Sequence, residues 1–163
     1  MAGDADPGKW NYTEHTETKH ELLEKYLGGW LAILGTRNRK LLVVDGFAGK
    51  GEYAGGEGGS PVIIHLKANE LIAAGKVDQV ICIFVERNEE NFRDLKSVLN
   101  ELPQNPSVEV VAPKAAEFED VVDNLFEKYP DGNVIPSFWL IDPFGFTGMG
   151  FETVRKIMWQ LHT

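Results

Sequence analysis

The chain has 163 residues, of which 43% are hydrophobic and 25% charged, and its formal net charge at pH 7 is −9. This composition is ordinary for a one-domain globular protein. The acidic balance argues against a general nucleic-acid binder, which would need a basic face. No apolar run approaches the roughly 20 residues that span a bilayer, and the polar, acidic amino terminus does not resemble a signal peptide. We therefore expect no membrane attachment, a flexible segment over residues 1–15 and a single domain over residues 16–163.

Cys82 is the single cysteine of the chain, which excludes an internal disulfide. A lone cysteine suits a reducing compartment, and we expect the protein to be cytoplasmic. Cys82 lies within the apolar run 80–85, so we interpret it as a small residue of the core.

The amino-terminal part of the chain predicts a helix, a strand and a second helix. Apolar residues recur at helical spacing over residues 16–34, and Gly35 follows as the expected C-terminal cap. Residues 40–45 form an apolar run that ends in an aspartate, as in a buried strand. Ser60, followed by a proline, predicts an N-cap and the start of a helix over residues 60–74.

The pattern continues to the end of the chain. Residues 79–86 are apolar at nearly every position, which indicates a strand covered on both faces. Asn88 is the expected N-cap of the helix that comes next. The same signals predict helices over 88–102, 117–129 and 150–162, and strands over 108–111 and 137–142.

These elements alternate along the chain between helix and strand. Such alternation implies right-handed crossovers and a parallel sheet with helices on both faces. We expect an α/β, Rossmann-like, doubly wound parallel sheet with the strand order 3-2-1-4. Doubly wound folds usually carry more than four strands, so the sequence indicates a minimal or truncated version without further carboxyl-terminal strands.

The richest motif follows the first predicted strand, where Asp45 is succeeded by Gly46, Gly49 and Gly51. A Walker A loop requires a lysine directly after the second of two glycines spaced five apart. Glu52 stands at that position, so we do not expect a triphosphate site.

A dinucleotide-binding fingerprint is the second interpretation of this loop. Gly49, Gly51 and Ala54 satisfy the GxGxxG/A pattern. The ribose-binding acid should then follow about 20 residues later, whereas Glu86 lies 35 residues after Gly51. Glu52 would also add negative charge beside a pyrophosphate. An NAD-dependent oxidoreductase is therefore the less favoured alternative.

S-adenosylmethionine is the third candidate ligand, because it is cationic and carries no phosphate. Asp45 at the strand tip can attract its amino-acid end, and the three glycines let the backbone approach its methionine part. Glu86, at the tip of the second strand, can accept hydrogen bonds from both ribose hydroxyls. This ligand fits the acidic residues that weigh against a dinucleotide.

The fourth strand ends in Asp142-Pro143-Phe144. In a sheet of order 3-2-1-4, the ligand crevice is expected between strands one and four. The carboxylate and the neighbouring carbonyl can accept hydrogen bonds from an exocyclic amine, and the aromatic ring can stack on a planar base, worth roughly 1–3 kcal/mol. The motif is also typical of an ordinary turn.

Three further residues are weaker candidates. Lys19 and His20 lie on the first predicted helix, where they can reach the carboxylate of a bound cofactor. Tyr53 can cover the methionine end of the site. A surface ion pair, a half-buried histidine and a packed loop aromatic are the alternatives. No cluster of His, Cys and Asp has metal-ligand spacing.

Several segments together resemble one known family. The segments DGFAGKGEY, GGSP, KHELLEKYLGGW and IDPFG are similar to those of the three-Cys-motif partner protein (TcmP) family. The resemblance extends from about residue 12 to residue 159. It implies a class I S-adenosylmethionine-dependent methyltransferase fold and a partner protein with a three-cysteine motif of the radical-enzyme type.

The resemblance also assigns residues. The ribose acid corresponds to Glu86, and the amine-binding motif to Asp142-Pro143-Phe144, which is similar to the DPFG of tRNA guanine-N2 methyltransferases. The cofactor loop corresponds to Asp45, Gly46, Phe47, Ala48, Gly49 and Gly51.

The leading hypothesis is an S-adenosylmethionine-binding methyltransferase that acts on a nucleobase amine together with a partner protein. Its acceptor would then be a nucleic acid. The alternative is a non-catalytic binding module whose cofactor site is degenerate.

Overall fold

The computed structural model describes residues 11–112, 114–128, 135–143 and 150–160. The elements alternate between helix and strand along the chain, as the sequence predicts. In chain order they are α1 (Glu14–Gly35), β1 (Lys40–Asp45), α2 (Ser60–Ala73), β2 (Gln79–Phe84), α3 (Glu89–Glu101), β3 (Val108–Val111), α4 (Phe118–Lys128), β4 (Ser137–Leu140) and α5 (Phe151–Gln160).

The four strands form one parallel sheet in the order β3-β2-β1-β4. The predicted α/β, Rossmann-like architecture and its strand order are therefore confirmed. β1 is paired along its length with β2, and its last four residues are paired with β4. Because all strands run the same way, their carboxyl ends lie at one edge of the sheet, where β1 and β4 are neighbours.

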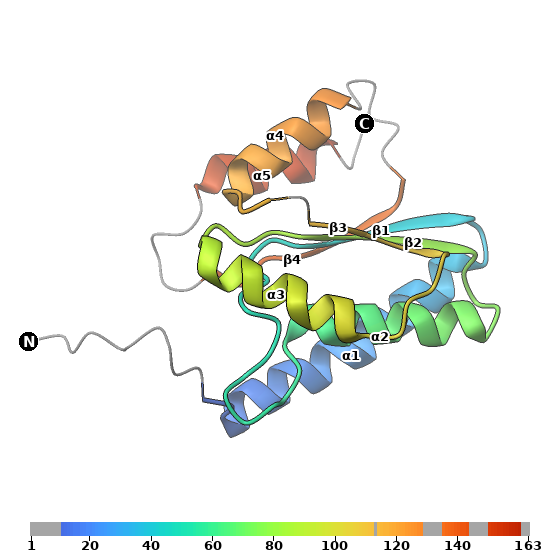
Figure 1. Cartoon of the computed structure of the whole chain (residues 1–163). Coiled ribbons are helices and arrows are strands. Elements are labelled where there is room, and N and C mark those ends of the chain that lie inside the picture. Colours follow the sequence, from blue (N-terminus) through green and yellow to red (C-terminus); the bar gives the residue numbers. More distant parts are fainter. Residues whose placement is uncertain (1–10, 113, 129–134, 144–149, 161–163) are drawn as a thin grey trace, which may run out of the picture.

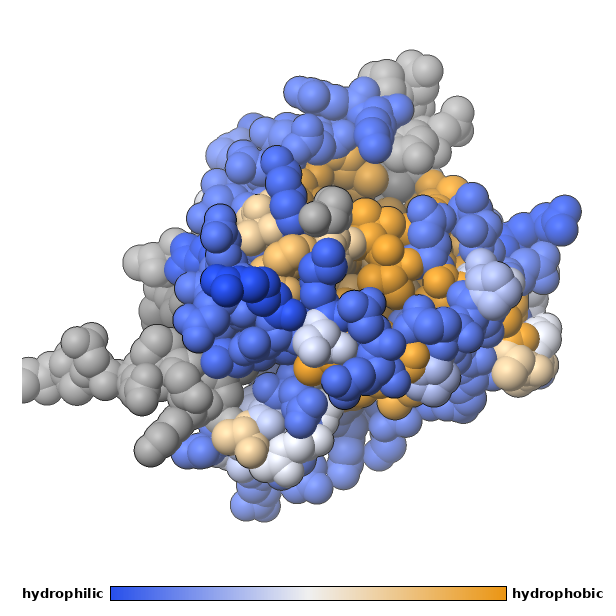
Figure 2. Space-filling view, viewed as in Figure 1, coloured by the Kyte–Doolittle hydropathy of each residue, from blue (hydrophilic) through white to orange (hydrophobic). Residues whose placement is uncertain are grey.

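The helices cover the two faces of the sheet in separate layers (Figure 1). α1, α2 and α3 lie below the sheet in that view, and α4 and α5 lie above it. On the face that Figure 2 shows, polar residues cover the outer parts of the two layers, and apolar residues gather between them. Among the described residues, no helix has the length and apolar character that crossing a bilayer requires.

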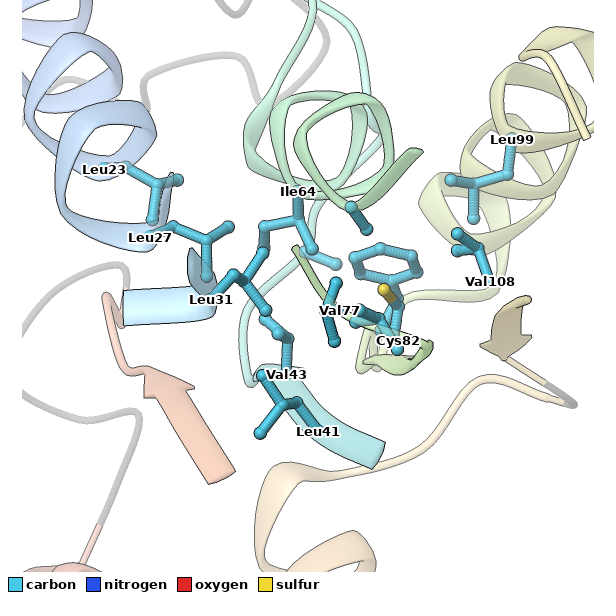
Figure 3. Packing of buried hydrophobic residues seen from close by; sticks show 14 of the residues in the cluster. Leu23, Leu27, Leu31, Leu41, Val43, Ile64, Val77, Cys82, Leu99 and Val108 are labelled. Carbon is cyan, nitrogen blue, oxygen red and sulfur yellow. The ribbon is translucent and has the colours of Figure 1, made fainter. Parts of the chain in front are cut away.

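Each face of the sheet has its own hydrophobic core. Leu27 and Leu31 of α1 and Ile64 of α2 are fully buried against β1 on the lower face (Figure 3). Cys82 is buried in the same core, and burial raises the pKa of its thiol to about 12, as expected for an inert core cysteine. On the upper face, Phe118 of α4 packs with the residues of a second cluster.

α1 ends differently from the sequence expectation. Gly35 is its last residue, and Thr36 is the C-cap in a right-handed helical conformation. A Cβ at position 35 would lie 2.2 Å from the carbonyl oxygen of Lys76. Glycine is therefore required there for a close approach of two backbones, and not for a left-handed cap.

The start of α2 also differs. Gly59 is the N-cap and makes no side-chain cap, so the prediction that Ser60 caps this helix is wrong. The Ser60 hydroxyl instead donates a 2.6 Å hydrogen bond to Oδ2 of Asp45. The predicted Asn88 cap of α3 is confirmed, because its side chain accepts hydrogen bonds from the amides of Glu90 and Asn91.

We expect Gly29→Ala to raise the free energy of unfolding by up to about 1 kcal/mol. Gly29 lies inside α1, and a Cβ there would meet nothing within 4 Å, so the substitution adds helix propensity without a clash. Urea unfolding measures the change. Gly35→Ala is the matched control on the same helix. It should destabilise the protein, because the new Cβ would clash with the carbonyl oxygen of Lys76. A destabilised Gly29→Ala variant would contradict this reading of α1.

Candidate functional site

The glycine loop after β1 is held to both neighbouring strands. The amide of Gly46 donates to the carbonyl of Leu140 at 3.0 Å, and the amide of Ala48 donates to the carbonyl of Val85 at 2.9 Å. Gly51 accepts a 2.8 Å bond from the amide of Gly59, which closes the loop at the start of α2. The loop is thus tied to β4, to the end of β2 and to α2.

Two of the predicted loop glycines have a backbone conformation that favours glycine. Gly49 has a φ of +65° and Gly51 a φ of +83°, in the left-handed region that other residues rarely adopt. Gly46 has a different reason to be glycine. A Cβ there would lie 2.7 Å from two ring carbons of Phe118, so the ring packs directly on the backbone.

A pocket of about 530 Å³ opens where β1 and β4 end. Its floor is formed by the β1 tip and the glycine loop, and one wall by the first half of α1. This is the crevice that the strand order predicts. Of the predicted site residues, those that line it are Lys19, His20, Asp45, Phe47, Ala48, Gly51, Tyr53 and Asp142.

Asp45 is buried at the centre of this floor, with 1% of its surface exposed. It accepts the hydroxyl of Ser60 at 2.6 Å and the amide of Phe47 at 3.2 Å. Burial raises the pKa of this carboxyl to about 6, with smaller contributions from the charges of Asp142 and Glu86. Within the described parts of the chain, no lysine, arginine or histidine forms an ion pair with Asp45. Asp45 is thus a buried anion, held by neutral donors, that faces a pocket.

Asp142 and Lys19 meet at the same pocket although 123 positions separate them. Nζ of Lys19 lies 2.5 Å from Oδ2 of Asp142, and both side chains remain about half exposed. The ion pair joins α1 to the segment that follows β4.

Three aromatic side chains gather at the α1 wall of the pocket. The ring centroids of Tyr12, His20 and Tyr53 lie 5.3 to 5.6 Å from one another. Nδ1 of His20 is buried and has no hydrogen-bond partner among the described residues. Burial, and next the charge of Lys19, lowers the pKa of His20 below its usual value. Tyr12 was not predicted from the sequence, since it lies in the segment expected to be flexible.

Glu86 lies just after the carboxyl end of β2, as expected, but outside the pocket at β1 and β4. It is half-buried and does not line the 530 Å³ pocket. Its Oε1 accepts the amide of Asn88 at 2.7 Å, and its carbonyl accepts the amide of Ala116 at 2.9 Å. It therefore helps to shape the turn before α3, farther along the same edge of the sheet.

The remaining predicted residues are placed only in part. Pro143 is half-buried and lies outside the pocket wall, and Gly46 and Gly49 shape the loop without lining the pocket. Phe144 lies outside the described residues. Among the described residues there is no group of three or more His, Cys, Asp and Glu side chains that could hold a metal ion.

Comparison with known proteins adds no argument about the fold or the function. No family model and no curated protein matches the chain. One solved structure that matches is the NAD+ synthetase from Burkholderia pseudomallei, with 10% sequence identity and a TM-score of 0.36. The match covers 96% of this chain and 58% of that protein, so the chain spans somewhat more than half of its length. At this level of similarity the match carries no inference about ligand or activity.

Proposed function

We propose that the pocket at the tips of β1 and β4 binds S-adenosylmethionine, and that the protein is a methyltransferase of a nucleobase amine that works with a partner protein. One observation carries the proposal: Asp45 is a buried carboxylate that lacks a cationic partner among the described residues and faces a pocket. A buried charge is costly unless it is paired, so a cationic ligand is the partner that the site lacks.

The distribution of charge around the pocket supports a zwitterionic ligand. Asp45 offers a negative charge at the floor, and Lys19 offers a positive charge on the α1 wall. The amino-acid end of S-adenosylmethionine carries both complementary charges, and its sulfonium adds a second cation. Glu86 lies farther along the same sheet edge, on the side toward which the ribose would extend under this proposal.

The acceptor half of the proposal rests on Asp142 and on the apolar wall beside it. Tyr26 of α1 and Phe138 of β4 line the pocket, with ring centroids 5.9 Å apart. The exposed Tyr26 ring can stack on one side of a planar base while the Asp142 carboxylate accepts a hydrogen bond from the amine of that base. When bound, S-adenosylmethionine supplies an electrophilic methyl group. The protein would then contribute mainly by holding the acceptor nitrogen in line with the carbon–sulfur bond.

Calorimetric titration with S-adenosylmethionine, S-adenosylhomocysteine and NAD tests the cofactor. We expect the first two to bind with one site per chain and NAD not to bind, because Glu52 and Asp45 repel its pyrophosphate. Binding of NAD without binding of S-adenosylmethionine would overturn the proposal in favour of a dinucleotide enzyme.

A non-catalytic binding module is the second candidate function. It is favoured by large apolar side chains that remain exposed on two helices. On α1, Leu22, Tyr26 and Ile33 are 64 to 68% exposed, and on α5 Phe151 and Trp159 are more than 70% exposed. Surfaces of this kind mark contacts with other proteins. Methyl transfer to RNA or DNA that is lost on Asp142→Ala would exclude this candidate.

A further inference from the structure

The ion pair between Lys19 and Asp142 occupies two groups that the proposed function needs for other purposes. Under that proposal, Lys19 binds the carboxylate of the cofactor, and Asp142 accepts the amine of the methyl acceptor. In the structure the two side chains are bonded to each other at 2.5 Å, across the pocket that both of them line. An Asp142 carboxylate that is held by an ammonium group is a poor acceptor for a neutral amine.

The pair can open without disturbing the fold. Both side chains are about half exposed, at 49% for Lys19 and 58% for Asp142. Exposed ion pairs of this kind are weak, because water solvates both partners when they separate. A ligand carboxylate that arrives in the pocket can therefore replace Asp142 as the partner of Lys19.

We propose that Asp142 and the carboxylate of the cofactor compete for Lys19, so that binding of the cofactor releases Asp142 and thereby creates the acceptor site. The inference rests on the proposed function and adds an order of binding to it. The cofactor binds first and the amine-bearing acceptor second.

If Asp142 and the cofactor compete for Lys19, substitutions of these two residues should change the affinity for the cofactor in opposite directions. Asp142→Asn removes the competitor, so S-adenosylmethionine and S-adenosylhomocysteine should bind about two- to fivefold more tightly than to the wild type. Lys19→Met keeps the length of the side chain but removes the charge, so both ligands should bind about tenfold more weakly. Calorimetry measures both changes at pH 7.

Two controls separate competition from general effects of charge. Glu152→Gln breaks an exposed ion pair of the same 2.5 Å length, with Arg155 on α5, away from the pocket, and should leave the affinities unchanged. 5′-Methylthioadenosine shares the nucleoside but has no carboxylate. Its affinity should not respond to Lys19→Met. Thermal melting checks that the variants remain folded.

His20 provides a readout that does not depend on any ligand. Its imidazole packs against Tyr12 and Tyr53. Burial and, to a smaller extent, the charge of Lys19 lower its pKa, and the charge of Asp142 opposes them. In NMR titrations we expect the pKa of His20 to rise in Lys19→Met and to fall in Asp142→Asn. The resonance of His20 is assigned by its loss in His20→Asn.

The outcomes distinguish the competition for Lys19 from the binding of the cofactor itself. Tighter binding to Asp142→Asn together with weaker binding to Lys19→Met supports the competition. If the wild type binds S-adenosylmethionine but Asp142→Asn weakens or does not change that binding, the competition is wrong and the cofactor proposal stands. If the wild type binds neither S-adenosylmethionine nor S-adenosylhomocysteine, both are overturned, whatever the His20 titration shows.

Discussion

Asp45→Asn is expected to raise the free energy of unfolding at pH 7 by up to about 3 kcal/mol. The pKa of Asp45 rises from 3.8 to about 6 on folding because the carboxyl is buried. Each pKa unit corresponds to about 1.4 kcal/mol, so a shift of roughly two units penalises the ionised native state by about 3 kcal/mol. Asparagine is neutral and can keep both hydrogen bonds, accepting from Phe47 and donating to the hydroxyl oxygen of Ser60.

Because folding raises the pKa of Asp45, the stabilisation by Asp45→Asn depends on pH. Below pH 4, Asp45 is protonated in both the folded and the unfolded state, so the stabilising neutral form is fully present. Between pH 4 and pH 6 the unfolded carboxyl ionises before the folded one, and this stability is lost as the pH rises. The gain from Asp45→Asn should therefore be largest at pH 7 and vanish near pH 4. Urea unfolding at pH 4, 5, 6 and 7 measures it.

The same variant should lose the proposed ligand. Without the buried anion we expect S-adenosylmethionine to bind about tenfold or more weakly at pH 7, because a charge-assisted interaction is replaced by a neutral one. Ser60→Ala is the matched control, since it removes a hydrogen bond from Asp45 but keeps the charge. A protein that is stabilised by Asp45→Asn and loses its ligand would have a site that sacrifices stability for binding. Unchanged stability at pH 7 would contradict the burial of an ionised Asp45.

Much of the fold is predictable because the apolar pattern constrains it directly. Strands covered on both faces must be apolar throughout, and β1 and β2 could be recognised for that reason. Alternation with helices and right-handed crossovers then leave few topologies, and 3-2-1-4 is the common strand order of the doubly wound type. The ends of elements are harder to predict. The role of Gly35 depends on Lys76, which lies 41 positions away in the sequence, and no local signal reveals such an approach.

The site is predictable to the extent that it is local. Asp45 and Gly51 belong to one short loop, and the structure brings them to one pocket. The partners of these residues are not local. Ser60 has the sequence signature of an N-cap, yet its hydroxyl donates a hydrogen bond to Asp45. Lys19 forms an ion pair with Asp142, which lies 123 positions away in the sequence. Contacts of this kind depend on how the elements pack, which periodicity and spacing do not encode.

Gly46→Ala should cost about 1–3 kcal/mol of stability, because the new methyl group would overlap the ring of Phe118. The ring is 3% exposed and packs against Phe47 and Trp139, so it has little room to move. Phe118→Ala alone should cost more, about 3–5 kcal/mol, since it empties part of the upper core. Gly55→Ala, in the same loop, is the control. Its Cβ would meet only the carboxylate end of a flexible glutamate, and little change is expected.

The double variant Gly46→Ala/Phe118→Ala separates overlap from other effects of the added methyl group. Once the ring is absent, Gly46→Ala should cost little, so the two single effects should exceed the double effect by about 1–3 kcal/mol in urea unfolding. Additive effects would mean that the cost of Gly46→Ala does not arise from overlap with the Phe118 ring. If Phe118 also fixes the loop against β4, Gly46→Ala should weaken the binding of S-adenosylmethionine, because the amide of Gly46 ties the loop to Leu140 beside the pocket. The packing of a core phenylalanine on a glycine would then position the floor of the site.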